Sequence, residues 1–301
     1  MRASSLRARH LTVFLAVARA GSMQRAAAEA HLTQPAISKL IGELEGIFGR
    51  QMFERSRRGV TLTECGEVLV ERAEALLNDL DHAAVEIDNI ARGIAGNVRI
   101  GVLPVAEARI VPATLFALRK RVPSLTVSIE EGTRLFLMAG LRKGEIDCVI
   151  GRLDDSAAED DLHREALVAM PIRIVSHPTH PLARRRRLSL ADLAAYPWIV
   201  PQAGVPIRRV IDRQFAEAGI AAPVPAIESS SDRLNCAVLA RTDMIAVMTD
   251  DGAKAYSNSG EVVVLPIKVA DRLPSVGVMT RASYISNSLK TFLQALRDTV
   301  R

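Results

Sequence analysis

The chain has 301 residues, of which 49% are apolar and only 4% aromatic. This composition favours a packed aliphatic α/β protein and excludes a disordered chain. No apolar run approaches the roughly 20 residues of a membrane-spanning helix, and the basic start lacks the apolar stretch of a secretory signal. Cys65, Cys148 and Cys236 lie far apart and make no metal-binding or redox spacing. We therefore expect a cytoplasmic protein with free thiols and no membrane partner.

The net charge of +5 is concentrated at the N-terminus. Residues 1–65 contain ten lysines and arginines against five acidic residues, a surplus equal to that of the whole chain. The remaining residues are therefore balanced in charge. A basic segment on an otherwise neutral chain indicates that the N-terminal region meets a polyanion.

Three helices are predicted in this basic region. The first covers about residues 6–20 and ends at Gly21, because glycine adopts the left-handed conformation after a helix at little cost. Ser22 can cap the second helix. Thr33 can cap the third helix, whose first turn tolerates Pro35 because the missing N–H would be unpaired there anyway.

The third helix and the segment after it carry polar groups suited to DNA. Gln34, Ser38 and Lys39 fall on a side of the helix away from its apolar residues, where they can meet base edges and phosphates. Two short strands, at about residues 52–53 and 60–62, follow this helix. The tip between them, residues 55–59, places three arginines around a glycine turn, which suits a narrow groove or a row of phosphates.

Several fixed spacings occur together in this region, namely Thr33-Gln34-Pro35-Ala36-Ile37-Ser38, Leu44-Glu45, Phe48-Gly49, Phe53-x-Arg55, Arg58-Gly59 and Leu62-Thr63-x-x-Gly66. The pattern closely resembles the winged helix-turn-helix of LysR-type transcriptional regulators. The resemblance implies contacts to double-stranded promoter DNA from Gln34, Pro35, Ser38 and Lys39, and contacts to its backbone from Arg55, Arg57 and Arg58. The alternative for each of these polar residues is an ordinary solvated surface.

A long helix is predicted from Gly66 to about Arg92, a stretch without proline or internal glycine. Apolar residues recur along it in alternating steps of four and three, at Leu69, Ala73, Leu76, Leu80, Ala83, Ile87 and Ile90. Such a heptad seam must be buried, either on its own domain or against a partner helix. The family resemblance implies antiparallel pairing with a second copy, hence a homodimer through this helix and a homotetramer on two adjacent DNA sites.

The second region alternates strands and helices. Strands are predicted at about residues 98–102, 125–129, 146–150, 172–176, 198–200, 245–248, 262–265 and 276–280, and helices at about residues 106–121, 134–143, 207–218, 232–241 and 284–300. This alternation predicts parallel sheets with crossover helices. The region is too long for one compact unit, and segments 169–173 and 273–275 are expected to be paired crossings.

The second region resembles the effector domain of the same family, a two-lobed fold like that of periplasmic solute-binding proteins. The motifs that carry this resemblance are Arg99-Ile100-Gly101-Val102, Glu131-Gly132-Thr133, Gly144-x-Ile146-Asp147, His180-Pro181-Leu182-Ala183, and Leu188-x-Leu190-x-Asp192-Leu193 before Pro197-Trp198. The expected α/β architecture has a winged helix-turn-helix at residues 1–65, a linker helix at 66–93 and an effector-binding domain at 94–301. Its first lobe is expected at about 98–170 plus 275–301, and its second at about 171–274.

Ligands of α/β sheets bind outside the carboxyl ends of strands, where helix N-termini supply unpaired N–H groups. Loops in such positions give the predicted effector-binding residues Leu103, Val105, Thr133, Arg134, Gln202, Ile207, Arg208 and Ser230. Thr133 matches a family position whose hydroxyl commonly meets the effector, although it can also cap a helix. Arg134 and Arg208 are candidate partners of an anion. The effector expected from the resemblance is a sugar or an aromatic acid.

The expected function is that of a sequence-specific, ligand-responsive transcriptional regulator, with RNA polymerase as a further partner. No nucleophile elbow, P-loop, dinucleotide fingerprint or metal cluster occurs, so we expect neither an enzyme nor a bound cofactor or metal. The alternative is a solute-binding module without a role in gene regulation. The basic run Arg184–Arg187 could be a second DNA contact or a localisation signal, but its position between two family motifs favours a solvated surface loop.

Overall fold

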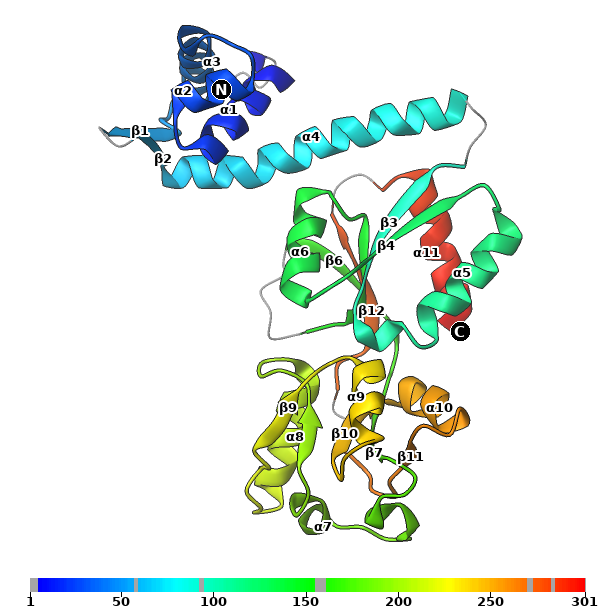
Figure 1. The fold of residues 1–301 in the computed structure, drawn as a ribbon. Helices are drawn as coiled ribbons and strands as arrows, with labels where there is room; N and C mark the ends of the chain where they lie inside the picture. The colour runs from blue at the N-terminus through cyan, green and yellow to red at the C-terminus, as the bar shows by residue number, and fades with distance from the viewer. Residues whose placement is uncertain are drawn as a thin grey trace. The chain divides into compact units, whose positions relative to one another are not determined.

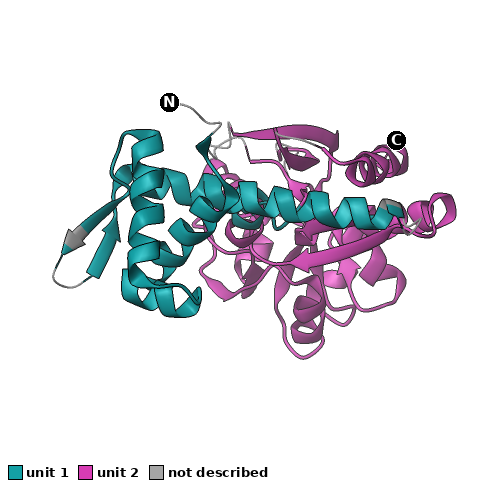
Figure 2. Ribbon diagram, turned by 90° about the horizontal axis from the view of Figure 1, so that it is seen from above, with its two compact units in different colours: residues 1–96, 138–146 teal, residues 97–137, 147–301 magenta. Residues whose placement is uncertain are grey.

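The structure is a computed structural model that describes residues 5–56, 59–91, 95–154, 161–269, 273–282 and 285–300 (Figure 1). The chain divides into two compact units, residues 1–96 with 138–146, and residues 97–137 with 147–301 (Figure 2). Among the described residues, no helix is both long and apolar enough to span a membrane.

The N-terminal unit begins with three helices, α1 (Ala8–Ala20), α2 (Met23–Glu29) and α3 (Gln34–Phe48). Gly21 ends α1 with φ 60°, and the Ser22 hydroxyl caps α2 by accepting a hydrogen bond from the Arg25 N–H, as predicted. Thr33 stands at the N-cap of α3, but its side chain makes no capping hydrogen bond. The three helices enclose a core that includes Phe14, Ala26, Ala27, Ile37, Ile41 and Leu44.

Two antiparallel strands, β1 (Phe53–Ser56) and β2 (Gly59–Leu62), follow α3. The carboxylate of Glu45 on α3 accepts a hydrogen bond from the backbone N–H of Met52, 2.8 Å away, and so fixes where β1 begins. Gly59 has φ 130° and lies against the backbone carbonyl of Gly21, where a Cβ atom would collide. The glycine is therefore required by close packing of the strand pair on the end of α1.

The long helix α4 (Glu64–Ala91) uses its apolar seam in two ways. At its start, Leu69 and Ala73 are buried in the core of the three-helix domain. Further along, Leu76, Leu80 and Ile87 are exposed. The first alternative, burial on its own domain, thus applies to the start of the helix, and the later part of the seam is exposed in the single chain. The side chain of Ile90 lies outside the described residues.

The second unit contains two lobes, each built on a five-stranded sheet. The elements of the first lobe are β3 (Asn97–Val102), η2 (Pro104–Ala106), α5 (Ile110–Arg121), β4 (Thr126–Glu131), β5 (Cys148–Arg152), β6 (Leu162–Val168), β12 (Val276–Arg281) and α11 (Asn287–Val300). Helix α6 (Arg134–Lys143) follows β4, and from residue 138 on it is grouped with the first unit. The strand order is β4-β3-β5-β12-β6. Helices α5 and α11 pack side by side (Figure 1).

The second lobe has the strand order β11-β7-β10-β8-β9. Its elements are β7 (Ile172–Ser176), η3 (Pro181–Arg184), α7 (Leu190–Ala194), β8 (Trp198–Val200), α8 (Pro206–Glu217), β9 (Pro225–Glu228), α9 (Asp232–Leu239), β10 (Ile245–Thr249), α10 (Asp250–Asn258) and β11 (Val263–Val264). Trp198 lies fully buried at its centre, stacked edge-on against Phe215 and donating a hydrogen bond to the Leu193 carbonyl. The sequence analysis missed β6, β9, α7 and α10.

The prediction of parallel sheets was wrong, because both sheets are mixed. Strand β12 runs antiparallel to β5 and β6, and β7 runs antiparallel to β10 and β11. The other pairings are parallel. In the first lobe β3 pairs with both β4 and β5, and in the second lobe β8 pairs with both β9 and β10. β7 and β12 each follow a crossing from the other lobe, so each enters its sheet at the edge where the parallel strands have their carboxyl ends. Each of them must therefore run antiparallel to those strands. The bounds expected for the domains and lobes stay a prediction.

Candidate DNA interface and effector site

The outer face of α3 carries the residues predicted to meet DNA. Gln34, Pro35 and Lys39 are exposed and Ser38 is half-buried, while Ile37, Ile41 and Leu44 on the opposite side are buried. Burial of one side in the domain core fixes the direction in which the other side points. Helix α3 can therefore present this set of polar groups as a rigid surface.

Lys39 belongs to a short chain of polar contacts that joins α3 to α1. Its amino group lies 4.0 Å from a carboxylate oxygen of Glu43, whose other oxygen lies 3.1 Å from Nε2 of the buried His10. The lysine is itself exposed, so this contact orients it without removing it from solvent. Arg57 and Arg58 lie outside the described residues, as does the side chain of Arg55. Their predicted backbone contacts stay a prediction.

In the first lobe, two predicted effector residues take part in packing. Leu103 donates its backbone N–H to the Ile150 carbonyl at 2.9 Å and lies against Gly151, where a Cβ atom would collide with it. Val105 in η2 is buried. Both residues hold the loop after β3 against β5. They can shape a site there, but their side chains offer no polar contact.

Thr133 and Arg134 follow β4. The Thr133 hydroxyl accepts a hydrogen bond from the Phe136 N–H, at 3.3 Å, so it acts in this structure as a helix cap. The Arg134 guanidinium donates to the backbone carbonyl of Arg152 at 2.8 Å and also lies near the Met279 sulfur. Arg134 thus ties the loop after β4 to the end of β5.

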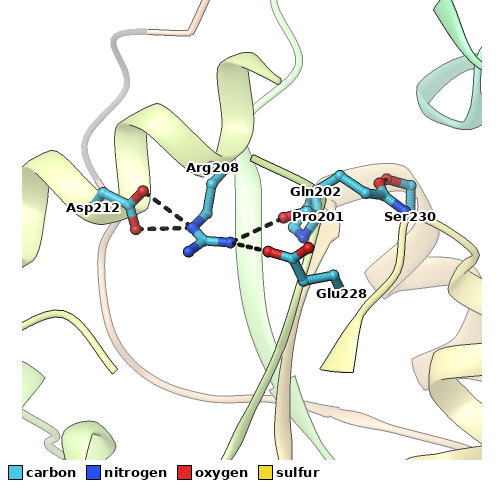
Figure 3. Close-up of polar contacts among 6 residues, drawn as sticks. All are labelled: Pro201, Gln202, Arg208, Asp212, Glu228 and Ser230. Carbon is cyan, nitrogen blue, oxygen red and sulfur yellow. Dashed lines mark hydrogen bonds and ion pairs between the residues drawn. The ribbon is translucent and has the colours of Figure 1, made fainter. Parts of the chain in front are cut away.

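Figure 3 shows how the second lobe holds Arg208. Its Nε atom lies 2.9 and 3.0 Å from the two carboxylate oxygens of Asp212, and another nitrogen lies 3.0 Å from Glu228 and 3.4 Å from the Pro201 carbonyl. Burial lowers the pKa of Arg208, but its bonds to the two carboxylates outweigh this and raise the pKa overall. The arginine, which the sequence made a candidate partner of an anion, is therefore already paired with two carboxylates in this structure. An anionic effector would have to displace two carboxylates.

The remaining predicted residues lie beside this cluster. Ser230 donates its hydroxyl hydrogen to the side-chain oxygen of Gln202 at 2.9 Å, which joins the loops after β8 and β9 (Figure 3). Both are polar and Gln202 is exposed, so they can bind a ligand. Ile207 packs instead against the core of the second lobe. The structure thus brings Gln202 and Ser230 together and assigns Ile207 to packing.

Arg152, which the sequence analysis did not consider, connects the two crossings between the lobes. Its guanidinium donates to the Pro274 carbonyl at 2.7 Å and to the Met170 carbonyl at 2.8 Å, and the residue is only 5% exposed. Burial lowers its pKa to about 10. A charged residue at the end of the otherwise apolar strand Cys148–Arg152 was the available sequence signal, since an arginine is rarely buried without partners.

Two ion pairs also join the lobes. Arg109, just before α5, places Nε 2.6 Å from an oxygen of Asp251 on α10. Arg209 on α8 lies 2.9 Å from the largely buried carboxylate of Asp154, which follows β5. The partners are far apart in sequence, and no local pattern could have paired them.

Carboxyl groups gather where strands of both lobes end. Burial and the nearby charge of Glu107 raise the pKa of Asp232, the first residue of α9, to about 7. Burial also raises the pKa of Glu107, and Glu131 at the end of β4 adds to the effect. Glu107, Glu131 and Asp232 therefore lie near one another, and each carboxyl group can take part in a hydrogen bond. Within the described ranges, no three such side chains are grouped to hold a metal ion.

Comparison with known proteins decides the family. Residues 8–67 match the bacterial regulatory helix-turn-helix of the lysR family, and residues 91–301 match the LysR substrate binding domain. The chain belongs to the LysR family. It is 30% identical to the transcriptional regulator GbpR of Azospirillum brasilense over 97% of this chain and 86% of that protein. It is 31% identical to PcaQ of Agrobacterium fabrum over 96% of this chain and 94% of that protein.

Solved LysR structures share the fold. The crystal structure of full-length CbnR with its target DNA has a TM-score of 0.66 and 21% identity, covering 98% of this chain and 100% of that one. A full-length variant of OxyR from Pseudomonas aeruginosa has a TM-score of 0.65 and 23% identity, covering 98% of this chain and 95% of that one. This LysR protein is thus a DNA-binding transcriptional regulator with a substrate-binding effector domain. The match over both regions contradicts the alternative of a solute-binding module without a regulatory role.

Proposed function

We propose that this regulator reads operator bases with the outer face of α3 and that a small ligand bound between its lobes changes this binding. The observation that supports the first part is a helix buried on one side and polar on the other, with Gln34 and Ser38 one turn apart. The wing arginines Arg55, Arg57 and Arg58 would then hold the DNA backbone. Such a protein works in the cytoplasm beside the chromosome and RNA polymerase, and none of its steps needs catalysis.

Two substitutions test the reading of bases by α3. Gln34→Ala and Ser38→Ala should each cost about 1–3 kcal/mol of discrimination between operator and mismatched DNA, because each removes a hydrogen-bonding group from a base edge. Binding to a set of single-base operator variants, measured at fixed salt, checks this. Gln51→Ala makes the same change at an exposed position outside α3 and should leave the discrimination unchanged. Parent-like discrimination in both α3 variants would assign base reading to another element.

The chemistry between the lobes favours a sugar over an aromatic acid. Glu107, Glu131 and Asp232 lie at the ends of strands from both lobes, and the only predicted cation of the second lobe, Arg208, is already paired. Carboxyl groups can hydrogen-bond to sugar hydroxyl groups whether or not they are ionised, and those that are ionised repel a carboxylate ligand. Gln202 and Ser230 add uncharged polar groups of the kind that bind sugar hydroxyls.

A ligand screen on the full chain tests this proposal. Sugars and aromatic carboxylates would be compared by the shift that each produces in the thermal unfolding midpoint, since a ligand stabilises the state that binds it. We expect a rise with a sugar, and a smaller rise with the same sugar in Gln202→Ala. A rise with an aromatic acid alone would overturn the preference for a sugar.

The exposed second part of the α4 seam supports a homodimer. Leu76, Leu80 and Ile87 leave a row of large apolar side chains in water, which one copy of the helix can cover on another. Paired dimers would give the expected homotetramer on two adjacent DNA sites.

A further inference from the structure

Four consecutive arginines, Arg184–Arg187, begin at the last residue of η3 and continue toward α7 in the second lobe, and all four are exposed. Figure 1 places α7 at the end of the second lobe that faces away from the first lobe. The run is therefore separate from the groups between the lobes.

Both ends of this run are fixed to the lobe. Before it, Leu182 is buried in the core, and its carbonyl accepts the Arg185 N–H at 3.1 Å. After it, the Asp192 carboxylate accepts hydrogen bonds from the Arg185 guanidinium at 2.8 Å and from the Ser189 hydroxyl at 2.7 Å. The loop is thus already ordered, so little backbone entropy would be lost when a ligand binds to it.

Only one of the four arginines has an acidic partner among the described residues. Arg185 pairs with Asp192, whereas Arg184, Arg186 and Arg187 make no ion pair there. Other arginines of the second lobe do pair with acids, as Arg173 does with Asp250. Three unpaired like charges side by side repel one another, and an anionic partner would relieve that repulsion.

The type of anion follows from what surrounds the run. Residues 177–197, all of them described, contain no strongly exposed large apolar side chain. Stable protein interfaces need apolar or aromatic anchors, which this loop does not offer. Guanidinium groups match the oxygens of phosphates, and a row of them suits a row of phosphates. The phosphate row that this DNA-binding chain already meets is the DNA backbone.

We propose that Arg184, Arg186 and Arg187 form a second, sequence-independent contact to the DNA backbone, outside the helix-turn-helix domain. The proposal rests on the DNA binding stated above and extends it. The contact would lengthen the DNA segment covered by each copy and add salt-dependent affinity without adding base preference.

The test replaces the three arginines by glutamine in the full chain and keeps Arg185 for its ion pair. The dependence of operator binding on salt would be measured for parent and variant. The slope of log affinity against log salt should become shallower by about 0.9 for each phosphate that the variant no longer binds, while discrimination between operator and mismatched DNA is retained. Fluorescence of Trp198, buried in the same lobe, reports whether the variant is folded.

A matched variant separates a local contact from a change in net charge. Arg213, Arg233 and Lys290 are also exposed and make no ion pair among the described residues, and their replacement by glutamine removes the same charge. The proposal requires that this control keep the parent slope. Equal changes in both variants, or a parent slope in the run variant, would overturn the second contact. Failure of the parent itself to bind DNA would instead overturn the underlying function.

Discussion

At the scale of single residues, the chemistry between the lobes is set by charged groups placed at strand ends. Arg152 satisfies backbone carbonyls of both crossings, so it stabilises the connection rather than serving a ligand. Asp232 contributes the opposite kind of group, a carboxyl that burial keeps protonated to unusually high pH. A buried acid of this kind makes stability depend on pH.

The pKa of Asp232 predicts a fall in stability as the pH rises from about 4 to about 7. The ordinary value is 3.8 and the folded value about 7, so within this window the folded chain binds the proton that the unfolded chain has released. Asp232→Asn should remove this part of the dependence and make the variant more stable than the parent above pH 7, on the order of 2 kcal/mol. Urea unfolding followed by Trp198 fluorescence at pH 5 and pH 8 measures it.

Asp243→Asn offers the matched control, because it makes the same change at an exposed carboxyl of the same lobe. Its stability should follow the pH dependence of the parent. If Asp232→Asn also followed the parent, the carboxyl would be ionised throughout this range.

At the scale of elements, the apolar seam of α4 is buried in one part of the helix and exposed in another. Its first turns complete the core of the DNA-binding domain, and its later turns expose the same seam to water. One continuous helix therefore links the position of the DNA-binding domain to the proposed dimer contact. A helix transmits such a constraint because its backbone hydrogen bonds make it stiff.

Leu80→Glu should weaken the dimer by about 100-fold or more. An antiparallel pair buries this side chain twice, and each burial contributes about 1.5–3 kcal/mol. Val85→Glu is the control, since Val85 is 53% exposed and Leu80 is 55% exposed, yet Val85 lies off the seam. Sedimentation equilibrium gives both dissociation constants. Similar weakening by the two variants would mean that the seam is not the contact.

At the scale of the effector unit, the two lobes are held by a few long-range polar contacts around two chain crossings. The ion pairs Arg109–Asp251 and Arg209–Asp154 join them, and Arg152 fixes the crossings themselves. A ligand that changes the spacing of the lobes must act against these contacts. Their strength therefore sets how much binding energy a switch needs.

A double-mutant cycle on Arg209 and Asp154 should give a coupling of about 1 kcal/mol, because Asp154 is largely buried and the pair is only partly screened. The single variants Arg209→Gln and Asp154→Asn and the double variant would be unfolded in urea with Trp198 fluorescence as the signal. The coupling should shrink at high salt. Additive effects would show that this pair does not hold the lobes together.

The sequence by itself determined the features that depend on neighbouring residues. Gly21 and Ser22 placed the turn between the first two helices, and the apolar period of α3 identified its outer face, because capping and periodicity act within a few residues. The positions of most strands of the effector region followed for the same reason. The motif spacing also identified the family, which the domain matches confirmed.

Only the tertiary structure decided which distant groups meet. The direction of β7 and β12 depends on the lobe from which each strand arrives, and the burial of Leu69 on its own domain depends on packing against α1 and its neighbours. The same holds for Arg208, a candidate partner of an anionic ligand from the sequence, which the fold pairs with Glu228. Such pairings depend on contacts between segments far apart in the chain, so composition, spacing and periodicity cannot predict them.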